Sequence, residues 1–467
     1  MPRALIALTA LAAALRLPTL GSQSLWLDEV LTARLASGSL GDLFHQVAEQ
    51  EANPPLFYVV QWLWAQVAGT GELALRLPSA LCGIALVPVA YGIGRRLGER
   101  RAAVALAALV AVHPLLVYYS QEARGYAAVA LACAVGFLYF LDAAEGRRGA
   151  LGWALASAVA LGCHYFAIFP VAVEAAILLA RRGRAALPAL AGVGVAGAAL
   201  LPLVLEQLDG EHGDNVTAGA SIAGRVKGIV VSWLVGERGA AIANLEWLAG
   251  VLMLAGAALL LLRRGGRDAL LPAAVGGGGA ALMLLAALAG ADYLNNRNTL
   301  PVLVVLLAIP ALGFAAGRAG AALGAATCAV LAAATVGALI DPAHAREDWR
   351  DTARALRGSE AVVIDPRNAI ALQWYEPGLR AAPAASVGEL AIVVADPKRD
   401  PLPPGALDAP PAPGFSPAGT RTRDRVLIAR YRAATPQPVT REAVDAWVRT
   451  RLDPIRGARG AILLTRR

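Results

Sequence analysis

The sequence predicts a polytopic α-helical membrane protein that carries a small α/β domain at its carboxyl end. Hydrophobic residues make up 57% of the 467 residues and charged residues only 16%, whereas a soluble chain carries about a quarter charged residues. Apolar stretches also recur along most of the first 340 positions, and about 20 apolar residues cross the hydrocarbon core as a helix. The last 127 residues or so lack such stretches and show short strand-like runs instead.

The apolar stretches predict about eleven membrane-spanning helices in a domain that covers residues 1–340. Their richness in Ala, Gly and Leu, including GGGG at 276–279, suits close helix packing in lipid. The expected spans are 3–20, 73–94, 101–119, 124–142, 149–164, 166–181, 185–206, 242–262, 269–290, 299–317 and 320–340.

Clusters of arginine predict the orientation of these spans. They fall on alternate loops, at 94–101, 145–149, 181–184, 263–267 and 317–318. Positive charge in short loops marks the cytoplasmic side, and the opposite loops are longer but carry few basic residues. The amino terminus is therefore expected inside and the carboxyl-terminal domain outside. This placement explains the net charge of +8 without a nucleic-acid partner.

The stretch NPPLFYVVQWLWAQVAG at 53–69 does not fit this alternation. If it crossed the membrane, every later basic loop would be inverted. We therefore expect a re-entrant or interfacial helix, with Trp62 and Trp64 at headgroup depth, inside a first outer loop that runs from 21 to 72. Residues 1–20 could instead be a signal peptide, although no small-x-small cleavage site follows them; the later topology is the same either way.

Residues 341–467 change character and predict an α/β domain outside the membrane. The strand-like runs are AVVID at 361–365, LAIVVAD at 390–396 and RVLIARY at 425–431. Helical patterns, REDWRDTARALR at 346–357 and TREAVDAWVRTRL at 440–452, alternate with them. A proline-rich stretch at 401–417 divides the domain as a loop.

Ionisable residues at the lipid boundary are expensive unless they face a cavity or water. Two adjacent carboxylates, Asp28 and Glu29, directly follow the first span within SQSLWLDEVLTARLASG at 22–38. For His164 or Glu122 alone a solvated loop residue is the more ordinary interpretation, but the topology brings several such groups to one face. The other candidates for substrate binding at this face are Glu51, Asn53, Tyr119, Gln121, Glu122, Arg124, Tyr126, His164 and Arg297.

The order of these sequences resembles a known family. A membrane helix followed by LWLDE, NPPLFY, LRLPSAL and HPLLVYYSQEARGYA is similar to the amino-terminal half of the polyprenol-dependent glycosyltransferases of GT-C fold. The branch most like it contains the bacterial relatives of protein O-mannosyltransferases and the aminoarabinose transferase of lipid A. The resemblance is dense over residues 15–145 and looser at CHYF, YLNNRNTLP and EDWRDTA.

This resemblance implies an enzyme that moves a sugar from a polyprenyl phosphate to an acceptor hydroxyl on the outer side of the membrane. It assigns the general base to Asp28, and Glu29 would orient that base or bind the sugar. A positioned carboxylate lowers the barrier because the attacking hydroxyl becomes acidic as the bond forms. The phosphate leaving group needs charge stabilisation, for which Arg124 and Arg297 are the candidates. One base without a second acid predicts a single displacement with inversion.

The sequence departs from the family at Asn53, where relatives often carry His or Glu at or next to this position. The resemblance leaves a divalent metal ion open as a cofactor, and Glu51, His164 or Glu122 would then be its ligands. The sugar also stays open among mannose, aminoarabinose, arabinofuranose and galactose. The expected partners are a polyprenyl-phosphate sugar, membrane lipids and an acceptor protein, lipid or glycan.

Two other classes compete with an enzyme. A membrane transporter or lipid-linked sugar flippase would place its charges near the bilayer midplane and often contains an internal repeat, whereas the polar residues here gather at one face and no repeat is visible. A non-catalytic scaffold would have no use for a carboxylate pair at the lipid boundary. Richness in Ala and Arg is typical of a high-GC bacterium, which predicts the bacterial cytoplasmic (inner) membrane.

Overall fold

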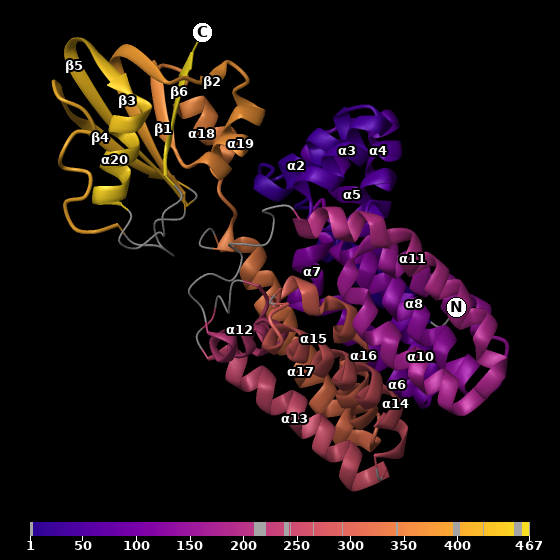
Figure 1. The fold of residues 1–467 in the computed structure, drawn as a ribbon. Coiled ribbons are helices and arrows are strands. Elements are labelled where there is room, and N and C mark those ends of the chain that lie inside the picture. The colour runs from indigo at the N-terminus through magenta and orange to yellow at the C-terminus, as the bar shows by residue number, and fades with distance from the viewer. Residues whose placement is uncertain are drawn as a thin grey trace. The chain divides into compact units, whose positions relative to one another are not determined.

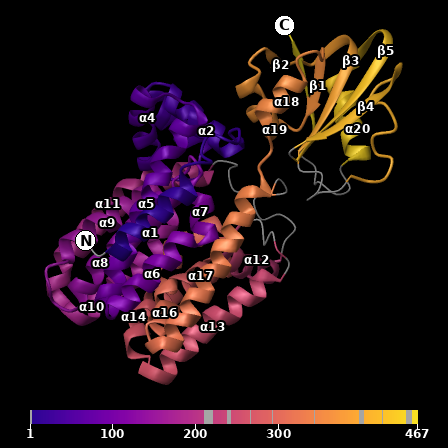
Figure 2. The ribbon, with the colours of Figure 1, turned by 180° about the vertical axis from the view of Figure 1, so that it is seen from behind.

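The computed structural model separates into two compact units. The helical unit comprises Met1–Leu20 and Thr32–Ile340, and the sheet unit comprises Gly21–Leu31 and Asp341–Arg467. The sequence analysis expected residues 21–31 within the first outer loop, and it gave no sign that they group with the carboxyl-terminal domain. Figures 1 and 2 label the elements of both units. The structure describes residues 3–209, 221–237, 242, 244–264, 266–291, 293–341, 344–395, 402–423, 425–452 and 460–466.

The helical unit is built almost entirely from apolar helices. Most residues of α8 and α16 are buried, whereas few residues of α11, α13 and α17 are buried, as in helices that face lipid. The elements of this unit are α1 (Arg3–Arg16), α5 (Glu72–Leu97), α6 (Arg100–Val112), α7 (Pro114–Ser120), α8 (Tyr126–Ala144), α9 (Ala150–Cys163), η1 (Tyr165–Ala167), α10 (Ile168–Arg182), η2 (Gly183–Ala186), α11 (Leu187–Asp209), α12 (Ile222–Val235), α13 (Leu245–Arg264), η4 (Arg267–Ala269), α14 (Leu270–Pro272), η5 (Ala273–Gly277), α15 (Gly278–Leu288), η6 (Arg297–Thr299), α16 (Leu300–Phe314) and α17 (Gly317–Ile340).

Each expected span coincides with helical structure, but the number long enough to cross a membrane is smaller than eleven. Within the described part of the chain, 7 helices are long and apolar enough, or up to 8 if the bent pair α6 and α7 forms one span. The difference arises because α1 and α9 have only 14 residues each and because α10 and α11 belong to one helical segment, Tyr165–Leu208. The chain is a multi-pass membrane protein, as predicted.

The expected span at 101–119 is bent by 56° where α6 ends and α7 begins. Pro114 starts α7 and has no N–H to continue the helical hydrogen bonds. Two distant helices satisfy the carbonyl groups that the break leaves unpaired. Arg16, of α1, donates to the carbonyl of Ala111 at 2.8 Å. The Thr335 hydroxyl, of α17, donates to the carbonyl of Val112 at 2.6 Å. The bend is therefore a built feature that orients α7 toward the candidate site.

The region between the first span and α5 is helical as well. It contains α2 (Leu27–Ser37), α3 (Leu40–Gln50) and α4 (Leu56–Ala68). Ser39 begins α3 with a capping box, in which its side chain accepts from the N–H of Asp42 while the Asp42 carboxylate accepts from the backbone N–H of Ser39. The predicted helix at 53–69 is α4, which is shorter than a span. Its two tryptophans, Trp62 and Trp64, donate to backbone carbonyls at 2.9 and 2.8 Å.

The sheet unit contains a mixed six-stranded sheet in the order β2-β6-β1-β3-β5-β4. β1 and β3 run parallel, and the other neighbours pair antiparallel. α18 and α19 lie side by side in both views (Figures 1 and 2). The elements are α18 (Trp349–Ala355), β1 (Ala361–Ile364), α19 (Pro366–Tyr375), β2 (Leu379–Ala381), β3 (Ala384–Ala395), β4 (Phe415–Arg423), β5 (Val426–Thr440), α20 (Arg441–Arg451) and β6 (Ile462–Arg466).

The predicted α/β domain is confirmed, and all three predicted strands and both helical patterns are present as β1, β3, β5, α18 and α20. Strands β2, β4 and β6 were not predicted. The expected loop at 401–417 runs into β4, whose residues after Phe415 are all exposed. An edge strand with Pro, Gly and alternating Arg carries no hydrophobic pattern from which it could be recognised.

Candidate active site

A buried ion pair in the helical unit joins two of the predicted site residues. The guanidinium group of Arg124 donates to Oε1 of Glu51 at 2.7 Å and to Oε2 at 2.8 Å. Both side chains are only 5% exposed. Tyr58, which the sequence analysis did not single out, donates its hydroxyl to Oε2 of Glu51 at 2.8 Å and lies beneath the guanidinium at 5.4 Å. A two-pronged pair of this kind is among the strongest polar contacts in proteins.

Two of the sequence motifs meet at the start of α8 and explain how Arg124 is held. Ser79 of LRLPSAL donates its hydroxyl to the backbone carbonyl of Arg124 at 3.1 Å. Gly125 suits the close packing here, because a Cβ at this position would lie 3.2 Å from the carbonyl oxygen of Cys163 and 3.4 Å from Phe57. A larger residue would push the start of α8 away from α9 and α4.

A second group surrounds the Tyr126 ring. The guanidinium of Arg297, in η6, lies over this ring at 5.7 Å, which is a cation–π contact. The His164 ring lies 5.8 Å away from the same ring, and its Nδ1 accepts from the backbone N–H of Phe166 at 3.2 Å. Arg297 and Arg124 both lie within electrostatic range of His164. Four predicted site residues from three separate segments, Arg124, Tyr126, His164 and Arg297, thus come together.

Tyr119 extends this group toward a carboxylate that the sequence analysis missed. Its ring packs edge-on against Tyr126 with 5.1 Å between ring centroids, and its hydroxyl donates to Oε2 of Glu237 at 2.7 Å. Glu122, also predicted, is buried and lies within electrostatic range of Tyr119. Glu237 sits in GERG just after α12, where no motif marks it, so only the fold could identify it.

Two predicted site residues support the framework. The Gln121 amide donates to the carbonyls of Leu15 and Arg16 and to the Thr19 hydroxyl, at 3.3, 3.0 and 2.6 Å. It therefore caps the end of α1. Asn53 is half-buried, and its backbone carbonyl accepts from the Gln207 amide at 3.3 Å, which holds the turn before α4.

The remaining predicted residues, Asp28 and Glu29, lie in the sheet unit, in the first turn of α2. Residues 21–31 are called the DE segment below. Carboxylates are favourable at this end of a helix because the backbone N–H groups there are not used by the helix. Asp28 is half-buried, whereas Glu29 is fully buried. Oε2 of Glu29 accepts from the backbone N–H of Trp26 at 3.3 Å and pairs with Arg346 at 3.4 Å.

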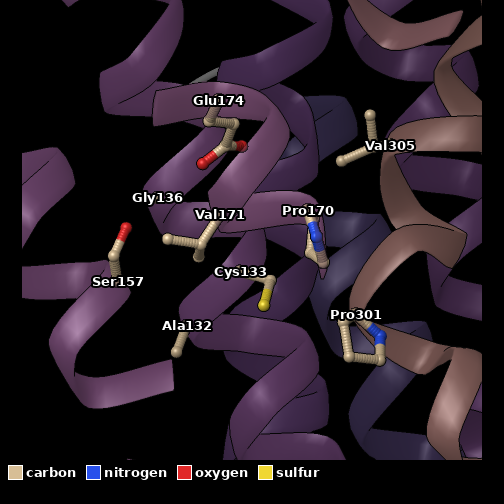
Figure 3. Close-up of a pocket in the computed structure, with 9 residues that line it drawn as sticks. All are labelled: Ala132, Cys133, Gly136, Ser157, Pro170, Val171, Glu174, Pro301 and Val305. Atoms are coloured by element: carbon tan, nitrogen blue, oxygen red, sulfur yellow. The ribbon is translucent and has the colours of Figure 1, made fainter. Parts of the chain in front are cut away.

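Another buried acid, Glu174 on α10, lies apart from these groups. Its carboxylate accepts from the Trp153 indole N–H at 2.8 Å. Figure 3 shows the carboxylate beside a narrow space that Cys133 and Ser157 also line. This space is too small for a water molecule. Glu174 is therefore a packed polar contact between α9 and α10 and offers no room for a substrate.

The expected metal ligands do not form a ligand set. Within the residues that the structure describes, no three His, Cys, Asp or Glu side chains gather as a metal site requires. Both oxygens of Glu51 accept hydrogen bonds from Arg124, and Nδ1 of His164 is taken by a backbone N–H. The donor set named from the sequence therefore does not fit a metal ion in this arrangement.

Comparison with known proteins supports the class that the sequence predicted. Residues 52–205, less than half of the chain, match the family model described as dolichyl-phosphate-mannose-protein mannosyltransferase. No curated protein matches the sequence. The crystal structure of ArnT from Cupriavidus metallidurans bound to undecaprenyl phosphate matches with a TM-score of 0.52 and 15% identity, over 91% of this chain and 97% of that chain.

Structures of the Archaeoglobus fulgidus oligosaccharyltransferase are more distant. Its complex with an inhibitory peptide and a dolichol-phosphate matches with a TM-score of 0.46 and 14% identity, over 76% of this chain and 57% of that chain. Its complex with Zn and sulfate matches with a TM-score of 0.44 and 14% identity, over 76% and 55%. The likeness to ArnT confirms the predicted GT-C fold, and with the family model it supports a glycosyltransferase.

Proposed function

We propose that this chain transfers a sugar from a polyprenyl phosphate to an acceptor hydroxyl on the outer side of the bacterial cytoplasmic membrane, with inversion at the anomeric carbon. The observation that carries this proposal is the group around Tyr126. A guanidinium, an imidazole and two tyrosines from η6, the turn after α9, α7 and α8 gather in a unit that is built mostly from apolar helices. Such groups are costly in a membrane protein unless they serve a substrate.

We assign the donor phosphate first to Arg297. Arg124 donates to both oxygens of Glu51 and so serves the framework, whereas Arg297 lies over the Tyr126 ring within the group that carries this proposal. A guanidinium forms a planar fork that suits phosphate oxygens. Arg124 then holds Glu51 and the start of α8 in place. Support for a lipid-linked donor comes from ArnT, which was solved bound to undecaprenyl phosphate.

Asp28 is the proposed general base, an assignment that rests on its place in LWLDE and on the family resemblance. It takes the proton of the acceptor hydroxyl while that oxygen attacks the anomeric carbon and the polyprenyl phosphate leaves with the bonding electrons. The neighbouring Glu29 cannot serve equally well, because its carboxylate is buried and pairs with Arg346. Acceptors in this proposal are hydroxyl groups of a protein, a lipid or a glycan.

The test uses the purified full-length chain in lipid nanodiscs. Undecaprenyl-phosphate sugars carrying mannose, aminoarabinose, arabinofuranose or galactose are offered together with membranes from a strain that lacks this gene, as the acceptor pool. We expect one donor to label the membranes. Asp28→Asn should lower that rate about 10² to 10⁴-fold, with undecaprenyl phosphate binding retained, and Glu29→Gln should cost less. Product NMR should show an inverted anomeric centre.

Three outcomes would count against the proposal. Retention of configuration would exclude a single displacement. Parental transfer by Asp28→Asn together with loss in Glu51→Gln would mean that another carboxylate is the base. Movement of intact lipid-linked sugar across a vesicle membrane, without transfer from any of the four donors, would favour the flippase alternative.

A further inference from the structure

Hydrogen bonds from α18 and α19 hold the DE segment just before the proposed base. The hydroxyl of Ser24 accepts from the backbone N–H of Trp349 at 2.9 Å. The hydroxyl of Tyr375, on α19, accepts from the backbone N–H of Leu25 at 2.6 Å. Two consecutive residues of the segment are therefore fixed by groups from two different helices of the sheet unit.

Arg346 adds a charged contact to this segment. It lies 3.4 Å from Oε2 of Glu29, and the exposed fractions of the two side chains are 6% and 0%. Its guanidinium also lies over the Trp26 ring at 5.6 Å, while the Trp26 backbone N–H donates to the same Glu29 oxygen. Arginine, tryptophan and glutamate thus enclose the turn in which α2 begins. An uncompensated carboxylate at this depth would cost several kcal/mol.

We propose that Arg346 is a positioning residue for the transfer reaction. Through Glu29 and Trp26 it fixes the first turn of α2, and so the direction in which the Asp28 carboxylate points. The carboxyl-terminal α/β domain then has a catalytic purpose, because it supplies the residue that holds the base. This inference rests on the proposed function, since it assumes that Asp28 is the base.

The proposal separates the roles of the two adjacent acids. A base must be reached by the acceptor hydroxyl, and Asp28 is half-buried, whereas Glu29 is enclosed on all sides. A misplacement of about 1 Å at a reacting group can lower a rate about 100-fold. Loss of Arg346 should therefore act on kcat, while donor affinity, which we assign to the helical unit, stays near the parental value.

The experiment compares Arg346→Gln, Arg346→Lys, Glu29→Gln and the double variant Glu29→Gln/Arg346→Gln in the full-length chain. Arg354→Gln is the matched control, because Arg354 is an exposed arginine near the end of α18. We expect Arg346→Gln to lower kcat about 10 to 100-fold and to leave the Kd for undecaprenyl phosphate within about twofold. The lysine variant should recover part of the rate. The double variant should be no worse than the poorer single one, because both residues act through one contact.

Amide hydrogen exchange gives a readout that does not depend on the substrate. Exchange in the DE segment of Arg346→Gln should be about tenfold faster or more, while α8 and α16 keep parental protection. Parental exchange and parental kcat in Arg346→Gln, with Asp28→Asn inactive, would overturn this inference and leave the proposed function standing. Equal activity of Asp28→Asn and the parental chain would instead defeat the proposed function, whatever the exchange shows.

If Arg346→Gln does not fold, Tyr375→Phe decides the question. It removes the acceptor of the Leu25 N–H and leaves the charges in place. We expect a kcat about two- to fivefold lower and faster exchange at Leu25, since one hydrogen bond contributes on the order of 1 kcal/mol. Parental values for both quantities would mean that the sheet unit does not position the segment.

Discussion

The helical unit and the sheet unit each bury a glutamate against an arginine, but the two pairs are built differently. In the helical unit, Glu51 accepts from both prongs of Arg124 and from the Tyr58 hydroxyl. In the sheet unit, the Glu29 oxygen that lies 3.4 Å from Arg346 also accepts from the backbone N–H of Trp26. In the first pair, side chains donate to both carboxylate oxygens of the glutamate. In the second pair, a backbone N–H donates to the glutamate, so the position of this side chain depends on the local backbone conformation.

This difference indicates what each pair contributes. The bidentate pair, with Tyr58 as a third donor, joins the end of α3 and α4 to the residues just before α8, so we expect its loss to lower stability first. The Glu29–Arg346 pair lies beside a backbone hydrogen bond and instead selects one conformation of a short segment. Its loss is felt first as lost order in the DE segment. Charge and burial alone would not distinguish the two pairs, since both are almost completely buried.

The largest effect on stability is expected from Arg124→Ala. It leaves the Glu51 carboxylate buried without its cation, and removing one partner of a buried pair costs about 3–5 kcal/mol. Thermal unfolding of the full-length chain in detergent should show a clear fall in Tm. Replacing both partners, as Glu51→Leu with Arg124→Met, should recover much of the loss because no charge is then stranded. An unchanged Tm in Arg124→Ala would remove the contrast between the two pairs.

Variants of Arg297, which lies over the Tyr126 ring, test whether this residue binds the donor phosphate. Arg297→Ala should weaken undecaprenyl phosphate binding about 10 to 100-fold, since a hydrogen bond to a charged group contributes about 1.5–3 kcal/mol. Arg297→Lys should recover only part, because an ammonium group lacks the planar fork. Arg318→Ala, at an exposed arginine of α17, is the control. If Arg124→Ala abolishes binding and Arg297→Ala does not, the phosphate contact moves to Arg124.

The sequence was sufficient for the parts of the molecule that hydrophobic pattern and local motifs determine. The spans follow from apolar length, and β1, β3 and β5 follow from runs of Val, Ile and Leu. Arg124 and Tyr126, both of the SQEARGY motif, lie among buried polar and aromatic side chains. These features depend on neighbours along the chain.

Contacts between distant segments could not be predicted. Nothing in REDWRDTARALR marks Arg346 as the partner of Glu29, because its pattern is that of an ordinary amphipathic helix. Glu237 likewise gains its place from the fold alone. Gln121, predicted to bind the substrate, donates to the carbonyls at the end of α1, a contact that the sequence around it does not indicate. Polar chemistry can be read from the sequence, but the partner of each group depends on tertiary structure.

The smallest effect is expected at a third acid–arginine pair, which sharpens the comparison because it is exposed. On α20, Arg449 donates to Asp445 at 2.8 Å one turn away, and the backbone N–H of Ala461 donates to the other oxygen. The hydrogen bond from Arg449 lowers the pKa of Asp445.

A carboxyl group whose pKa is lowered in the folded state stabilises the fold at pH values above its unfolded pKa of about 3.9. This contribution is lost as the pH falls through the folded-state pKa. Asp445→Asn should therefore cost only about 0.2–0.5 kcal/mol at pH 7, and its Tm difference from the parental chain should shrink below about pH 4. A loss at pH 7 as large as that of Arg124→Ala would show that burial is not what separates these pairs.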